Sequence, residues 1–270
     1  MSATEPSSMP IPPGLVKPFG CVRALIFQFE DSNFTAIPAT GFLLRFLGET
    51  FFITTRHAVM NAKFDTKDLC VPYSRRSNRC IPFPTVKTFS AVDRNDTDQV
   101  DIIVMKSDRS LIEELLFGDE QPFDVSEHQV VLDYTKGLLL HFKGITPEKN
   151  DLNYDDQKFH LHFSSAPAVY EGETIYRSIH MAKAAIPEDF PDFDGLSGSP
   201  LFAVTDENSY ESESLFAGML IRGTRSSQIL HFIEGARVKN YLLEFFIGHL
   251  PMEEGNIELG RIFQRYLEAK

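Results

Sequence analysis

The sequence predicts an all-β protein, and three observations support that class. Short apolar or alternating runs recur along most of the chain and are separated by polar or Gly- and Pro-containing stretches, as in sheets whose strands are joined by turns. Hydrophobic residues make up 43% and charged residues 24% of the 270 residues, a globular rather than a disordered composition. The runs show no internal repeat, so the pattern indicates ordinary sheets and not a solenoid.

The first group of predicted strands lies between Cys21 and Lys106. Its runs are CVRALIFQF, TGFLLRF, TFFITTRHAV and DIIVM. Two of them, GFLLRF and TFFITT, are separated only by Leu47, Gly48 and Glu49, and a short Gly-containing connection of this kind predicts a hairpin.

Residues 110–123 interrupt the strand pattern with an acidic stretch that carries Gly and Pro. Strand-like runs then resume as QVVLDY, GLLLHF, FHLHF, TIYRSIHMA, SPLFAV, SLFAGMLIRG and ILHFI. We therefore expect two β domains, with the boundaries that follow. The expected segments are a flexible lead-in (1–19), a first β domain (20–115), a linker (116–127), a second β domain (128–236) and C-terminal helices (237–270).

The C-terminal end has helical periodicity. Apolar residues recur at the spacing of an amphipathic stripe, first at Val238, Tyr241, Leu242, Phe245 and Phe246 and again at Leu259, Ile262, Phe263, Tyr266 and Leu267. Pro251 is expected to end the first helix, and Asn256 suits the N-cap of the second. The second helix is expected to dock either on the body of the protein, which is favoured because an amphipathic stripe needs only one apolar surface, or on a regulatory protein partner, for which residues 252–270 are the candidate contact.

Charge and cysteine content exclude several classes of function. The formal net charge of -12 would repel a phosphate backbone, so nucleic acid is not an expected partner. The N-terminus lacks a basic region followed by an apolar run, and no run is long enough to span a bilayer, so we expect a cytoplasmic protein without membrane contact. Three cysteines do not indicate a disulfide framework; free thiols are favoured, and a bridge between Cys70 and Cys80 stays open.

The strongest chemical motif is the segment GLSGSP, residues 195–200. A serine flanked by glycines fits a turn on which the N–H groups of Gly195 and Ser197 point to one place. Acyl transfer needs such a pair of donors for the oxyanion of its tetrahedral intermediate. Gly195 and Ser197 are therefore the expected oxyanion hole, with Ser197 as the nucleophile.

Two further segments supply partners for such a serine. His57 follows an apolar strand in ITTRHAV, and Asp101 directly precedes the apolar run IIVM. An acid at that position would be shielded from water, as one that orients an imidazole should be. Asp98 is the alternative acid, and Asp101 is preferred because it abuts the strand.

These segments resemble those of the chymotrypsin-fold serine peptidases. TTRHAV is similar to their TAAHC-type histidine segment, DIIVM to their aspartate segment and GLSGSP to their GDSGGP segment, in the same chain order. The resemblance covers about residues 20–250. It implies two packed six-stranded antiparallel β-barrels, catalysis by His57, Asp101 and Ser197 through an acyl-enzyme, and no metal or cofactor. The GxSGSP form looks more like glutamyl endopeptidases and other bacterial trypsin-like enzymes than like pancreatic ones.

Two positions depart from the pancreatic pattern. Leu196 stands where those enzymes carry the aspartate that pairs with a newly cleaved N-terminus, so activation by that ion pair is not expected. Pro191 corresponds to the floor of the specificity pocket. Asp192 and Asp194 would favour basic substrates and His231 acidic ones, so the cleavage specificity stays open. The expected pocket residues are Pro191, Asp192, Ile221, Gly223 and His231.

Two classes of function remain at this point. The first is a regulated intracellular endopeptidase acting on a protein or peptide. The alternative is a catalytically silent protease fold that serves as a binding module, because a fold does not fix a function.

Overall fold

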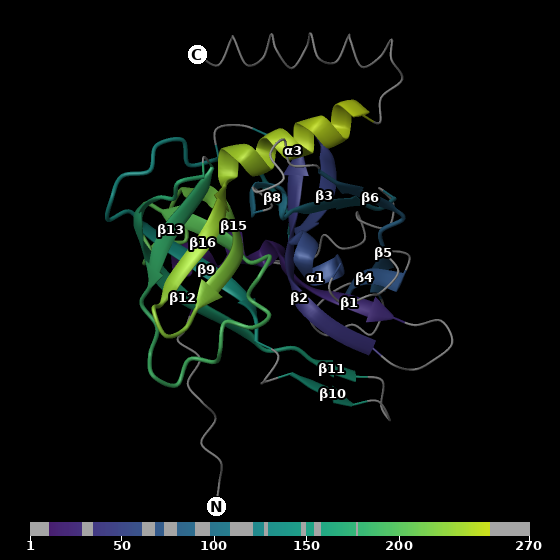
Figure 1. Cartoon of the computed structure of the whole chain (residues 1–270), viewed down its shortest axis with the longest axis horizontal. Coiled ribbons are helices and arrows are strands. Elements are labelled where there is room, and N and C mark those ends of the chain that lie inside the picture. Colours follow the sequence, from purple (N-terminus) through teal and green to yellow (C-terminus); the bar gives the residue numbers. More distant parts are fainter. Residues whose placement is uncertain are drawn as a thin grey trace, which may run out of the picture.

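The computed structural model describes residues 11–28, 35–60, 68–72, 80–89, 98–108, 121–126, 129–146, 150–153, 158–176 and 178–248. Most of the regular structure in these residues is strand, arranged as a curled sheet in the N-terminal half and a barrel in the C-terminal half (Figure 1). The prediction of a mostly β chain with two β bodies is therefore confirmed.

Eight strands form the N-terminal sheet, in the order β5-β4-β1-β2-β3-β7-β6, with β8 paired to β2. The pairing of β8 is parallel and the others are antiparallel. Within the described residues this half is thus a curled sheet of eight strands, where a closed barrel of six was expected. The strands are β1 (Val22–Gln28), β2 (Thr35–Phe46), β3 (Glu49–Thr54), β4 (Leu69–Pro72), β5 (Cys80–Pro82), β6 (Thr85–Thr88), β7 (Ile103–Lys106) and β8 (Phe123–Asp124).

Both faces of this sheet are covered by apolar side chains. On β3, Phe51 and Ile53 face one buried cluster, whereas Phe52 faces another inside the curl of the sheet. A strand that is buried on both faces reads as a continuous apolar run and not as an alternation. This explains why the three consecutive residues Phe51, Phe52 and Ile53 are all apolar.

Six strands close the C-terminal half into an antiparallel barrel, in the order β12-β13-β16-β15-β14-β9, as predicted. Its interior is apolar, with Phe142, Leu201 and Phe232 among the buried residues. A two-stranded hairpin of β10 (Asp151–Asn153) and β11 (Lys158–His160) lies between β9 and β12 in the chain. The barrel strands are β9 (Leu139–Ile145), β12 (Phe163–Glu173), β13 (Ile179–Ala184), β14 (Pro200–Val204), β15 (Ser214–Thr224) and β16 (Ile229–Glu234).

The predicted hairpin between the second and third strands is present. Phe46 of β2 pairs with Glu49 of β3, so Leu47 and Gly48 alone make the turn. Their φ angles of 52° and 80° are both positive, which is the backbone of a type I′ turn and matches the right-handed twist of the strands.

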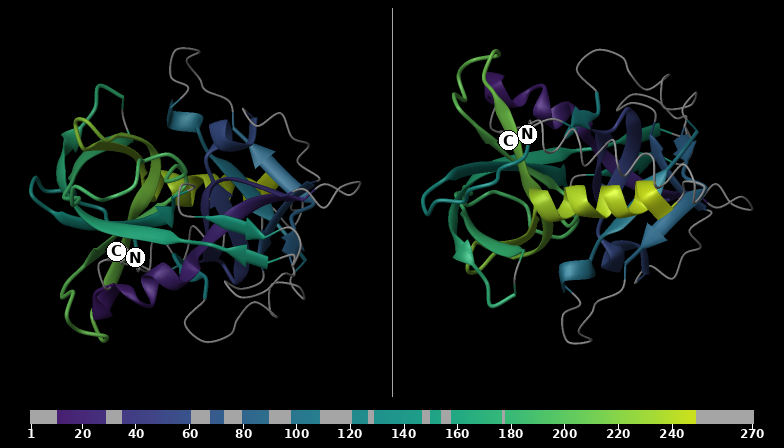
Figure 2. Two further views of the ribbon diagram at one scale, coloured as in Figure 1. Left: turned by 90° about the horizontal axis from the view of Figure 1, so that it is seen from below. Right: turned by 90° about the horizontal axis from the view of Figure 1, so that it is seen from above.

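The first predicted C-terminal helix is also present, as α3 (Gly235–Gly248). It starts from the barrel and runs across to the N-terminal sheet (Figures 1 and 2). Its apolar stripe packs there: the ring centroids of Phe245 and Phe51 are 5.4 Å apart, and those of Tyr241 and Phe89 are 4.2 Å apart. The helix therefore joins the two halves by apolar contact. The second predicted helix lies outside the described residues.

The lead-in expected to be flexible up to residue 19 is packed over its described part. Two 3₁₀ helices, η1 (Pro13–Leu15) and η2 (Pro18–Cys21), place Leu15 and Phe19 in the core. Phe19 contacts Phe202 of β14 with ring centroids 5.8 Å apart. Burial of these two apolar side chains outweighs the loop-forming tendency of the neighbouring prolines. The expected linker lies mostly outside the described residues.

Cys21, Cys70 and Cys80 are not joined in disulfides. Cys70 and Cys80 lie on adjacent strands and share a hydrogen bond, which raises the pKa of the Cys70 thiol together with its burial. No helix among the described residues combines the length and the apolar character needed to cross a membrane.

Candidate active site

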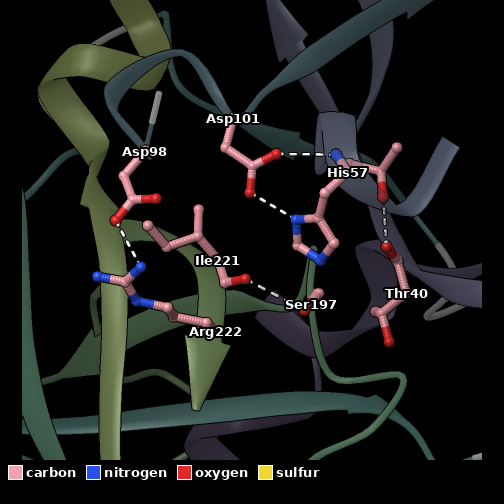
Figure 3. A network of polar contacts seen from close by, with 8 residues as sticks. Thr40, His57, Asp98, Asp101, Ser197, Ile221 and Arg222 are labelled. Atoms are coloured by element: carbon pink, nitrogen blue, oxygen red, sulfur yellow. Dashed lines mark hydrogen bonds and ion pairs between the residues drawn. The ribbon is translucent and has the colours of Figure 1, made fainter. Parts of the chain in front are cut away.

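His57 and Asp101 meet through two hydrogen bonds. α1 (Arg56–Met60) begins one residue after the end of β3 and carries His57, while the 3₁₀ turn η4 (Asp98–Val100) leads into Asp101. The backbone N–H of His57 donates to Oδ1 of Asp101 at 2.8 Å, and the imidazole Nδ1 lies 2.6 Å from Oδ2 (Figure 3). Since a carboxylate only accepts, Nδ1 carries the proton and Nε2 is left as the basic nitrogen.

The choice between Asp101 and Asp98 is decided by these contacts. Asp98 turns to the other half of the molecule, where its carboxylate lies 2.7 Å from the guanidinium of Arg222 on β15. Figure 3 shows the two acids pointing to different partners. Asp101 is therefore the acid that orients His57, and Asp98 links η4 to the barrel.

Ser197 lies on the turn between residue 191 and β14. Its hydroxyl donates to the carbonyl oxygen of Ile221 on β15 at 3.2 Å. In the view of Figure 3 its side chain lies on the side of the imidazole that faces away from Asp101. Within the described residues no hydrogen bond joins Ser197 to His57, so the structure brings His57 and Asp101 into contact and leaves the serine hydroxyl on a neighbouring carbonyl.

The turn that carries Ser197 is held from both halves of the protein. The backbone N–H and the hydroxyl of Thr40 on β2 donate to the carbonyl oxygen of Gly195 at 3.1 and 2.7 Å. The N–H of Gly198 donates to the carbonyl of Leu220 at 2.8 Å, and the N–H of Leu220 donates to the carbonyl of Ser199 at 2.8 Å. The turn is thus fixed at both ends by main-chain bonds.

Glycine is required on this turn for two reasons. Gly195 and Gly198 have φ angles of 82° and 87°, which side chains with a Cβ rarely adopt. A Cβ on Gly198 would also lie 2.1 Å from the carbonyl oxygen of Thr40. The N–H groups of Gly195 and Ser197 make no hydrogen bond to another described part of the chain, so both donors stay available to an oxyanion.

Leu196 anchors the same turn in the barrel core. Its side chain is fully buried and approaches β9 closely, since a Cβ on Gly144 would lie 3.0 Å from its Cδ2 atom. The residue directly before Ser197 is therefore an apolar anchor of the turn.

The fold is similar to that of a protein of known structure. No family model matches the chain, and neither does any curated protein. Among solved structures, a human heparin binding protein superimposes with a TM-score of 0.55 at 11% sequence identity, covering 84% of this chain and 91% of its own. The chain has a chymotrypsin-like fold. At this level of identity the likeness shows the fold alone, and a closer relation to glutamyl endopeptidases is not shown.

The expected pocket residues of this chymotrypsin-like fold occupy different environments. Pro191 is buried, whereas Asp192 is exposed and accepts a hydrogen bond from the N–H of Phe193 at 2.7 Å, so it caps its own turn. The exposed Asp194 lines no buried pocket floor either. Selection of a basic substrate by these acids is thus not supported by their positions.

His231, which was expected near the pocket wall, lies on β16. Strand alternation places it on the opposite face of β16 from Leu230, and it pairs in register with Arg222. Burial and the charge of Arg222 lower the pKa of His231, while Asp98 raises it. His231 therefore belongs to the surface group around the Asp98–Arg222 ion pair.

Sequence reasoning missed Thr40, which reaches the Ser197 turn from the other half of the fold. Its only sequence signal is a threonine within an apolar strand directly before Gly41, and that signal does not identify a distant partner. No cluster of three or more side chains suited to a metal ion occurs in the described part of the chain.

Proposed function

We propose that the protein is a serine endopeptidase that cleaves peptide bonds through an acyl-enzyme on Ser197. The observation that carries the proposal is the contact of both Asp101 carboxylate oxygens with His57, at 2.6 and 2.8 Å. Two bonds from one acid fix both the tautomer and the orientation of the ring, as a general base next to a nucleophile requires.

The chemistry follows from these positions. The oxygen of Ser197 attacks the scissile carbonyl carbon while Nε2 of His57 takes the hydroxyl proton. The N–H groups of Gly195 and Ser197 stabilise the oxyanion, and each such donor contributes about 3 kcal/mol of transition-state stabilisation. The C–N bond then breaks, His57 returns the proton to the leaving amine, and water hydrolyses the ester with His57 again as the base.

The serine hydroxyl must leave the carbonyl of Ile221 to reach His57. Rotation about the Cα–Cβ bond of Ser197 would release its hydroxyl from this carbonyl, and rotamers of solvent-accessible side chains interconvert within nanoseconds. Catalytic hydrogen bonds often form only when substrate is bound, so the contact with Ile221 is compatible with activity.

Fluorophosphonate labelling tests the proposal. The wild-type protein should form an adduct on Ser197, located by mass spectrometry, and Ser197→Ala should not label and should lose about six orders of magnitude in kcat. Ser199→Ala is the matched control, because the hydroxyl of Ser199 is buried and makes no hydrogen bond within the described residues. Equal hydrolysis by wild type and Ser197→Ala would reject the proposal.

A second candidate function is a catalytically silent binding module on the same fold. The contact of the Ser197 hydroxyl with Ile221 instead of His57 favours it. Absence of labelling at Ser197 under every condition that also preserves the fold would support this candidate over the peptidase.

The cellular location of the enzyme and its regulation by a partner are also part of the proposed function. We place it in the cytoplasm, as a bacterial-type enzyme, with a regulatory protein as partner and no nucleic acid or membrane. Residues 252–270, which lie outside the described part of the chain, are the candidate contact. Deleting them should change either peptidase activity or complex formation, and an unchanged result in both assays would remove this part of the proposal.

A further inference from the structure

The space beside Gly223 is filled by side chains of the protein itself. Gly223 lies on β15, two residues after Ile221, and pairs with Leu230 of β16. A Cβ built on Gly223 would lie 2.6 Å from Cδ2 of Phe193 and 2.9 Å from Cδ2 of Leu230. A methyl group at this position would therefore already collide with the protein.

Phe193 is a fixed part of this filling. Only 6% of its surface is exposed, and its ring meets that of Phe190 edge to face with centroids 6.1 Å apart. Both rings belong to the same buried cluster as Leu196 and Leu230. The residue also comes from the segment directly before Ser197, so its place is fixed together with the nucleophile turn.

The location of Phe193 and Leu230 relative to Ser197 determines which substrate side chains they would affect. Ser197 bonds to the carbonyl of Ile221, so a peptide lying along β15 would bring its scissile bond to Ser197. The side chain before that bond would then enter the space between the turn of Phe193 and Gly223. Arg222, which lies between Ile221 and Gly223 on β15, instead points to Asp98.

We propose that Phe193 and Leu230 restrict cleavage to bonds that follow a small residue, namely glycine, alanine or serine. The inference rests on the proposed function, since it concerns the substrate of the same site. A larger side chain has no volume to enter without displacing Phe193 from the barrel core, and dense packing resists such displacement.

Profiling with a peptide library tests the inference. Wild type should cleave after glycine, alanine or serine, and Phe193→Ala should raise kcat/KM for leucine or methionine at that position by at least about tenfold, the usual value of one or two methylenes in a pocket. Phe190→Ala is the matched control, because Phe190 lies in the same cluster but the three atoms nearest to a Cβ on Gly223 belong to Phe193 and Leu230. It should keep the wild-type preference.

A second measurement needs no variant and so does not depend on folding of Phe193→Ala. Wild-type Ser197 should react with a peptidyl phosphonate bearing an alanine side chain at least about tenfold faster than with one bearing phenylalanine. The reverse order, or an unchanged library profile in a folded Phe193→Ala that still labels with fluorophosphonate, overturns the inference and leaves the peptidase proposal intact. Absence of labelling by every reagent overturns both.

Discussion

The hydroxyl of Thr40 donates a hydrogen bond of 2.7 Å to the carbonyl oxygen of Gly195, so a strand of the N-terminal sheet holds the turn that carries Ser197. The same hydroxyl accepts a bond of 2.7 Å from the N–H of Ile145, and the carbonyl of Thr40 accepts one of 2.7 Å from the hydroxyl of Thr54. Thr40 thereby connects β2, β3, β9 and the Ser197 turn. Polar contacts and the buried side chain of Leu196 hold the turn.

Replacement of Thr40 by valine should weaken catalysis without removing any group that reacts. Thr40→Val keeps the shape of the side chain but removes the hydroxyl, which leaves the buried N–H of Ile145 without its acceptor at a cost of about 1–3 kcal/mol. We expect kcat to fall about tenfold or more with KM little changed, because a misplaced oxyanion donor acts in the transition state. Thr40→Ser, which restores the hydroxyl, should recover most of the rate. Equal loss in both variants would indicate a role in packing only.

Replacement of Gly198 by alanine should be far more damaging than the same change in the β2–β3 turn. Gly198 and Gly48 have similar φ angles, 87° and 80°, but only Gly198 is in close contact with other atoms. Gly48→Ala should therefore cost about 1 kcal/mol, the penalty of a left-handed alanine. Gly198→Ala adds a collision with Thr40 and should also abolish fluorophosphonate labelling. Thermal unfolding of both variants measures their loss of stability relative to wild type. Similar losses in the two variants would contradict a clash between an alanine at position 198 and Thr40.

The two neighbouring acids should respond very differently to amidation. Asp101→Asn should lower kcat by about four orders of magnitude, because an amide fixes the wrong imidazole tautomer. Asp98→Asn is matched in chemistry and lies three residues away, but it loses only a partly exposed ion pair with Arg222. Such pairs contribute about 0–1 kcal/mol, so its kcat should change only a few-fold. Comparable losses in the two variants would show that Asp98 shares the orienting role.

Local patterns in the sequence predict the parts of this protein that depend on neighbouring residues. Gly48 between two apolar runs predicts the hairpin, and the stripe from Val238 to Phe246 predicts α3. The placement of Asp101 directly before an apolar strand likewise predicts a shielded acid, and its contact with His57 follows that prediction.

The structural features that could not be predicted from the sequence all depend on contacts between distant segments of the chain. Thr40 and Gly195 are 155 residues apart, and no local pattern links a threonine in one sheet to a carbonyl in the other half. Phe193 reads as one more apolar residue near an acidic turn until β15 brings Gly223 against it. Leu15 and Phe19 lie in a short stretch rich in proline and glycine, so their burial is visible only in the structure.

The acid stability of the barrel should depend on Glu234. A hydrogen bond from His180, whose Nε2 lies 3.4 Å from Oε2 of Glu234, lowers the pKa of the carboxyl, with further lowering by Ser178 and Arg237 and opposition from partial burial. Because the folded pKa lies below the unfolded value of about 4.3, this stabilisation is complete above that pH and is lost as pH falls through the folded pKa. Glu234→Gln should therefore lower the free energy of unfolding at pH 7. The difference in this free energy between wild type and the variant should become smaller in strong acid. Denaturant unfolding from pH 7 to pH 3 measures this, with Glu171→Gln as the control because Glu171 forms an exposed pair with Lys136 at 3.7 Å. If the difference in free energy of unfolding between wild type and Glu234→Gln is the same from pH 7 to pH 3, Glu234 stabilises the barrel by packing and not through its charge.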